Sequence, residues 1–181
     1  MYAQEFVGIQ DALKINIRLR SHFSQLVASD VILGRVLEGT GRVESFRPIL
    51  SDLGEGSLSL DQAYRRTEME IPQHSSPLAG DGRVFATGWA ERLVRTQLSR
   101  FYNQAVLALV LADGQTHVHV PHSPHEAPSS QCSQLLAGRS YPAQVLHDNL
   151  VAAYRDGDYG KNPKIPHHPH CTHVVVPQLE T

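Results

Sequence analysis

The stretch from residue 84 to residue 111 constrains the fold of this chain more than any other feature of the sequence. Apolar side chains recur there every three to four residues, the spacing of one face of an α-helix. The residues on this face are Phe85, Trp89, Leu93, Phe101, Ala105 and Leu109, widened by Leu98 and Val106. The pattern predicts one long helix, which Gly88 weakens by up to about 1 kcal/mol relative to Ala.

The residues before this stretch predict further helices. Phe6, Ile9 and Leu13 begin an apolar periodicity that predicts a helix from residue 3 to about residue 27. A shorter helix is predicted over residues 43–53, although Pro48 is unfavourable in a helix interior.

A third helix is predicted to begin after Ser59. Ser59 and Gln62 have the spacing of a capping box, and the helix extends to about Met69. Residues 71–82 contain two prolines and two glycines, and they predict a loop before the long helix.

The residues after the long helix predict two strands and a helix separated by loops. Asp113 and Gly114 predict a turn, and the alternating, β-branched sequence that follows predicts a strand. The predicted elements are a strand over 116–120, a loop over 121–130, a helix over 144–154, a loop over 156–169 and a strand over 173–176. The two strands could pair in one antiparallel sheet.

These elements predict the α+β class. A mainly helical N-terminal half with the long central helix is followed by a small, two-stranded, loop-rich module. We place the boundary between a helical N-terminal region, residues 1–82, and a C-terminal part, residues 83–181. Composition supports the division: of 11 histidines, 9 lie at or after position 117, whereas 12 of the 16 lysines and arginines lie within the first 111 residues.

The C-terminal part contains a cluster of side chains that bind metals. His168, Cys171 and His173 lie within six residues, and Cys132 and His125 lie across the preceding loop. Zinc is bound tetrahedrally by cysteine sulfur and histidine nitrogen, and its ligands can come from two separate loops. The region has few apolar residues for its length, so a metal would help to hold it together.

Two other interpretations of this cluster stay open. The histidines could be solvated loop residues and the cysteines small buried apolar groups. Alternatively, Cys132 and Cys171 could form a disulfide, which a reducing cytosol disfavours. Two cysteines do not make the disulfide framework of a small secreted domain.

Catalytic motifs are scarce. The sequence contains no HExxH, no G-x-S-x-G, no P-loop and no dinucleotide fingerprint. His125 and Glu126 are adjacent, whereas a zinc deaminase needs H-x-E and P-C-x-x-C. The enzyme class that stays open is a metal-dependent hydrolase resembling a nuclease, with Asp148 or Asp158 as its carboxylate.

Charge and hydropathy exclude some partners. The formal net charge is -2, so the whole chain does not attract nucleic acid. Arg83, Arg92, Arg95 and Arg100 could touch a phosphate backbone, or they could form a solvated helix face with ion pairs. We expect no membrane segment, because no run of about 18 apolar residues occurs. The N-terminus lacks the pattern of a signal peptide, so we expect synthesis in the cytoplasm.

The order of the motifs resembles a known family. Arg95-Thr96 in the long helix is followed by the strand, by the segment from Cys132 to Tyr141, and by His168-Pro-His-Cys-Thr-His173 before Pro177. This order is similar to the order of motifs in the C-terminal domain of phage head morphogenesis proteins, the Mu-F-like minor head proteins. The similar region covers about residues 84–178.

The resemblance includes departures at the family's motifs. The family has R-T-E, then C-x-x-C, then H-P-x-C-R followed by Cys or His. This chain has Gln97 in place of the glutamate, Ser129 in place of the first cysteine of the pair, and Thr172 in place of the arginine. The missing cysteine departs from a standard four-ligand zinc site, and His125 could substitute for it.

The resemblance implies a structural virion protein rather than an enzyme. It would be a minor head protein made in the host cytoplasm, located in the head interior or at the portal vertex. Its partners would be the portal or the major capsid protein, with packaged DNA as a further contact, and residues 1–82 would be the docking arm. The expected ligands of a structural zinc ion are Cys132, His168, Cys171 and His173, with His125 in reserve. A third hypothesis is a metal-stapled binding module.

Overall fold

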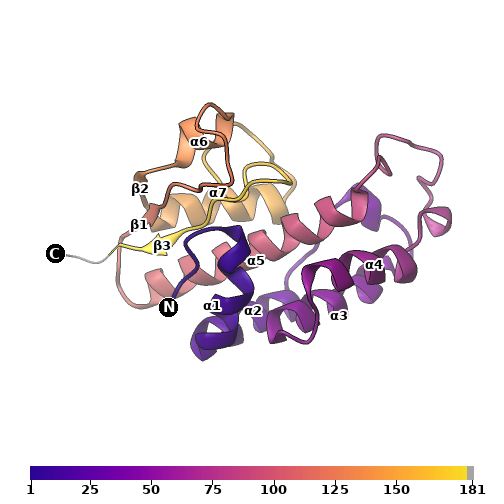
Figure 1. Cartoon of the computed structure of the whole chain (residues 1–181), viewed down its shortest axis with the longest axis horizontal. Helices are drawn as coiled ribbons and strands as arrows, with labels where there is room; N and C mark the ends of the chain where they lie inside the picture. The colour runs from indigo at the N-terminus through magenta and orange to yellow at the C-terminus, as the bar shows by residue number, and fades with distance from the viewer. Residues whose placement is uncertain (179–181) are drawn as a thin grey trace.

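The computed structural model describes residues 1–178, and the chain is mainly helical with one small antiparallel sheet (Figure 1). The predicted α+β class, with a helical N-terminal half and a long central helix, is confirmed. Residues 179–181, the end of the predicted C-terminal part, lie outside the described residues. The helices of the N-terminal half are α1 (Ile9–Ile15), α2 (Ile17–Ser29), α3 (Arg42–Glu55) and α4 (Leu60–Glu70). The later elements are α5 (Trp89–Ala112), β1 (His117–Val120), α6 (Gln131–Leu136), β2 (Arg139–Pro142), α7 (Ala143–Arg155) and β3 (Val176–Pro177).

The single helix predicted over residues 3–27 is wrong, because the chain bends at Asn16 and forms α1 and α2. The backbone of Asn16 is extended, and its side-chain oxygen accepts a hydrogen bond from the amide of Leu19 at 3.1 Å. This is an N-cap, which satisfies one of the free amides at the start of α2. Leu13 and Leu19 are both fully buried, so the apolar periodicity continues across the bend and hides it in the sequence.

The helix predicted over residues 43–53 forms as α3, and it continues through Pro48. Pro48 lies on the exposed side of α3. Proline in a helix interior costs about 3 kcal/mol. Four large side chains of α3 are fully buried, and each contributes about 1.5–3 kcal/mol, which outweighs that cost. They are Phe46, Ile49, Leu50 and Leu53.

Helix α4 begins as the sequence predicts. The Ser59 hydroxyl accepts from the Gln62 amide, and the Gln62 side chain accepts from the Ser59 amide, completing the capping box.

Helix α5 lies at the centre of the molecule (Figure 1). It begins at Trp89, five residues later than predicted, because Gly88 has a left-handed backbone with φ 76° and serves as the N-cap. Such a backbone favours glycine, which has no Cβ to clash. Helices α2, α3 and α4 pack on α5, and so do α7 and the strands β1 and β3. Helix α5 thus connects the N-terminal region to the C-terminal part.

The sheet has three strands in the order β2-β1-β3, one more than predicted. Strand β1 pairs antiparallel with both neighbours; Val118 and Val120 are buried, whereas His117 is exposed. The predicted pairing of the first strand with the C-terminal strand is confirmed. The latter is shorter than the predicted 173–176, however, and comprises Val176 and Pro177. Strand β2 was missed because it is an edge strand without alternating apolar residues.

Buried residues from both predicted regions form one continuous hydrophobic cluster. A fully buried cation, Arg100 of α5, lies within it and donates to the Asp30 carboxylate at 2.7 Å. Within the described residues, none of the helices has the length and apolar character needed to cross a membrane.

Candidate metal centre

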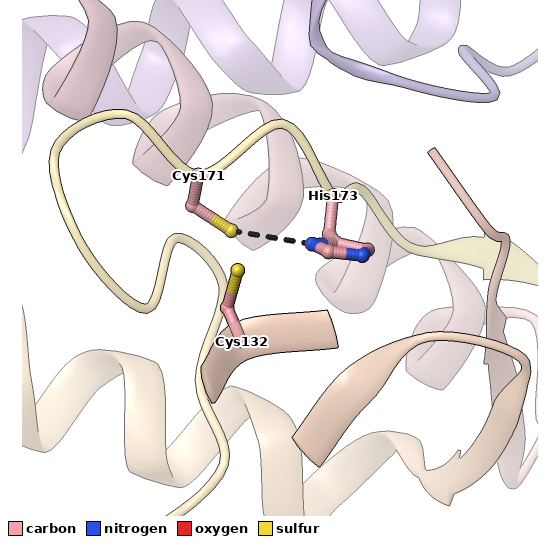
Figure 2. Close-up of side chains that lie close together, drawn as sticks. All are labelled: Cys132, Cys171 and His173. Carbon is pink, nitrogen blue, oxygen red and sulfur yellow. Dashed lines mark hydrogen bonds between the residues drawn. The ribbon is translucent and has the colours of Figure 1, made fainter. Parts of the chain in front are cut away.

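Two segments that are distant in sequence bring cysteines and histidines together. Cys132 lies in the first turn of α6, whose N-cap is Ser130. His168, Cys171 and His173 lie on the loop that leads from α7 to β3. Cys132 points from α6 toward Cys171, which lies with His173 on this loop (Figure 2).

Cys132, Cys171 and His173 form the buried group of the centre. Their ligand atoms all lie within 4.8 Å of one another, and all three residues are at most 2% exposed. The Cys171 sulfur lies 3.7 Å from Nδ1 of His173, and the Cys132 sulfur faces the Cys171 sulfur (Figure 2).

Glu126, Cys132 and His168 form a second group, which shares Cys132 with the first. Their ligand atoms also lie within 4.8 Å of one another, and Nε2 of His168 lies 3.1 Å from the Cys132 sulfur. The His168 side chain is 37% exposed, so this side of the centre is nearer to solvent. Cys132, His168, Cys171 and His173 do not form one group in which all ligand atoms lie within 4.8 Å of one another. Binding of all four to a single metal ion therefore requires a small side-chain movement.

The structure therefore brings all four predicted ligands to the Cys132 sulfur but leaves His125, the reserve ligand, elsewhere. Nδ1 of His125 lies 2.7 Å from a carboxylate oxygen of Glu5, and its side chain is 61% exposed. Ser129, which occupies the position of the family's first cysteine, is also exposed. Neither residue belongs to the two groups.

Sequence reasoning missed Glu126. Its only signal was its place next to His125, in a motif that did not match any known site. Both carboxylate oxygens have partners: one lies 3.4 Å from the amide and the hydroxyl of Thr172, and the other lies 4.0 Å from Nε2 of His168. Burial raises the pKa of this carboxyl. Hydrogen bonds from Thr172, Cys132 and Ser130, together with nearby His168, outweigh the effect of burial. The pKa of the Glu126 carboxyl is therefore lower than its ordinary value.

The two thiols lie close together, and their pKa values shift in opposite directions. A hydrogen bond from Cys171 lowers the pKa of the Cys132 thiol to about 5, with further lowering by Ser130 and His168 against the effect of burial. The hydrogen bond to Cys132, together with burial, raises the pKa of Cys171 well above its ordinary value. The thiolate is the form that binds metals, and the lowered pKa of Cys132 favours it.

The donor set fits a tetrahedral zinc ion. Zinc–sulfur bonds of about 2.3 Å and zinc–nitrogen bonds of about 2.0–2.1 Å separate neighbouring ligand atoms by about 3.3–3.8 Å. The contact between His168 and Cys132, 3.1 Å, and that between Cys171 and His173, 3.7 Å, lie close to these values. Nε2 of His173 is buried and has no hydrogen-bond partner in the part of the chain described, a cost of about 1–3 kcal/mol that metal binding would have to offset.

The N-terminal segment holds the ligand loop in place. The amide of Phe6 donates to the Thr172 carbonyl at 2.8 Å, between two predicted ligands. The Thr172 hydroxyl donates to Ser123 at 2.8 Å, and Ser123 donates to Glu5 at 3.0 Å. Residues 5 and 6 thus support the loop that carries Cys171 and His173.

The arginines on α5 form contacts within the protein. Arg100 is buried against Asp30, and Arg95 lies over the ring of Phe6, 4.2 Å from its centroid. Arg92 donates to two backbone carbonyls just before the helix. This arrangement does not form a basic stripe for a phosphate backbone.

No family model, no curated protein and no solved structure matches the chain.

Proposed function

We propose that this chain is a structural protein whose C-terminal part is stapled by a metal ion, with zinc as the best fit. The observation that carries the proposal is the meeting of two cysteines and two histidines, from two segments, in two groups that share the buried Cys132. Thiolate and imidazole ligands favour zinc over magnesium or calcium, which prefer oxygen. We assign Cys132, His168, Cys171 and His173 as ligands, with Glu126 beside them.

Burial of the centre supports a structural role over a catalytic one. A catalytic zinc site keeps one coordination position open to substrate, whereas a structural site is closed by four protein ligands. Three of the four proposed ligands are buried. Asp148 and Asp158, the carboxylates of the nuclease hypothesis, bond to Gln144 and Gly160 instead and belong to neither group.

The order of motifs supports a role as a phage minor head protein. In this proposal the chain joins the portal or the inner capsid during head assembly, and the helical region of residues 1–82 provides the docking arm. Exposed apolar side chains around the α1–α2 bend, among them Ile15 and Ile17, suit a protein contact. Packaged DNA is a weaker candidate partner, because α5 has no free basic stripe.

Metal analysis of the purified protein tests the staple. We expect about one zinc ion per chain, lost in Cys171→Ser and in His168→Ala. His125→Ala is the matched histidine control and should keep the metal, because His125 contacts Glu5 instead. A metal-free wild-type protein, or zinc that depends on His125 but not on Cys171, would refute the proposed ligand set.

A virion experiment tests the biological role separately. Particles purified from a phage encoding this chain should contain it in few copies, and mass spectrometry of banded particles measures this. A chain absent from intact particles but abundant in the lysate would overturn the virion role. Cleavage of DNA by the zinc-loaded protein, lost in Glu126→Gln, would instead favour the hydrolase.

A further inference from the structure

A cavity lies beside the metal centre, on the flank of the first half of α5. It has a volume of about 420 Å³, within the range of sites that bind ligands. Three segments line it: residues 33–36 after α2, the chain from residue 83 to residue 97, and the C-terminal chain from Tyr154 to Pro169. The two regions of the chain thus meet at this cavity.

Apolar and aromatic side chains make up most of the cavity wall. They include Leu33, Val36, Leu93, Trp89 and Tyr154. Such a wall favours a large apolar group over water.

Arginines supply the charged side chains of the cavity lining, and acidic groups lie only outside that lining. Arg35, Arg83 and Arg92 line it, and none of its lining residues is an aspartate or glutamate. Arg35 and Arg83 share a single carboxylate, Asp81, at 3.1 Å and 3.5 Å, and their side chains are largely exposed. One carboxylate for two guanidinium groups leaves excess positive charge at the mouth.

We propose that this cavity binds a peptide segment of a partner protein, through a large apolar side chain flanked by aspartate or glutamate. The apolar side chain fills the cavity, and the flanking carboxylates meet Arg35 and Arg83 at the mouth. Guanidinium groups pair well with carboxylates in such partly exposed positions. The inference deepens the structural role proposed above and rests on it for the partner being a protein.

The fluorescence of Trp89 reports binding, because Trp89 is the chain's single tryptophan and lines the cavity. The probe is a tryptophan-free hexapeptide, acetyl-Asp-Glu-Leu-Phe-Asp-Glu-amide, titrated into the purified full chain to about 1 mM. We expect a saturable change in emission. A peptide with lysine at the acidic positions, or with serine in place of Leu-Phe, should bind about tenfold more weakly or worse.

Gly34 offers a variant that fills the cavity. It lies on extended backbone in the cavity wall, and an added Cβ would meet only Leu93, at 3.9 Å. Gly34→Leu should therefore fold normally and lose peptide binding. Gly80→Leu is the matched control, because Gly80 lies outside the cavity in open space, and it should bind like the wild type.

Several results would overturn the peptide site: no saturable signal with the acidic peptide, equal binding of the basic peptide, or unchanged binding by a folded Gly34→Leu protein. Phenylbutyrate binding as tightly as the peptide would also overturn it, since the site would then hold a small amphiphile. Zinc content is measured separately from peptide binding. A chain that binds the peptide but contains no zinc would therefore refute only the proposed metal site. A zinc protein that binds no peptide refutes the peptide site alone.

Discussion

Gly54 marks the closest approach of two helices in the N-terminal region. A Cβ at this position of α3 would lie 2.3 Å from Cε1 of Phe23 on α2. Phe23 is fully buried and packs edge-on against Phe101, so its ring has little room to move.

We expect Gly54→Ala to lower the free energy of unfolding by about 1–3 kcal/mol through overpacking, although alanine favours helix by up to about 1 kcal/mol. Urea denaturation measures the change. Gly80→Ala, in open space, serves as the control and should shift the midpoint little. A Gly54→Ala protein as stable as the wild type would show that α2 and α3 can separate at this point without cost.

The ion pair between Asp30 and Arg100 is a second residue-scale feature with a large expected effect. The Arg100 side chain is fully buried, so removing its partner would leave an uncompensated charge. Asp30→Ala should cost about 3–5 kcal/mol in urea denaturation. Asp113→Ala breaks the exposed pair with Arg18 and should change the free energy of unfolding little, because solvent screens this pair. Equal losses in the two variants would contradict this account of burial.

At the scale of the element, the bend between α1 and α2 depends on the Asn16 cap. Asn16→Ala removes the acceptor for the Leu19 amide, and we expect a loss of about 0.5–2 kcal/mol in the free energy of unfolding. Asn16→Asp keeps an oxygen at this position and should keep most of the stability. If the alanine variant gained helical signal by circular dichroism without losing stability, α1 and α2 would have joined into the single predicted helix.

At the scale of the whole molecule, two buried tyrosines link folding to alkaline pH. Tyr102 accepts a hydrogen bond from the Ala3 amide, and Tyr154 donates to the Pro166 carbonyl. Burial raises the pKa of both hydroxyls well above their ordinary value of 10.0. In the unfolded chain both hydroxyls ionise near pH 10.0. Their contribution to the free energy of unfolding is therefore complete below pH 10.0 and is lost as the pH rises above this value.

We expect the free energy of unfolding to fall more steeply above about pH 10 in the wild type than in the Tyr102→Phe/Tyr154→Phe double variant. Urea denaturation at several pH values measures both slopes. Identical slopes in the double variant and the wild type would show that these hydroxyls ionise without unfolding.

The sequence by itself determined the features that depend on near neighbours. Helical periodicity predicted α5, the spacing of Ser59 and Gln62 predicted the start of α4, and alternation predicted β1. The ligand types, cysteine and histidine in two loops, also came from local pattern, and the structure brings those four residues together around Cys132. Each of these signals lies within a few residues of chain, which is the range of helix and strand periodicity.

Only the tertiary structure decided the features that depend on distant residues. Strand β2 exists because β1 offers it a hydrogen-bonding edge, and α3 tolerates Pro48 because its other face is buried. Glu126 joins the metal centre because Thr172 and His168 approach it from the loop before β3. His125, one residue earlier, points instead to Glu5 at the other end of the chain. The physical reason is the same in each case: packing between segments far apart in sequence sets these contacts, and local periodicity contains no information about them.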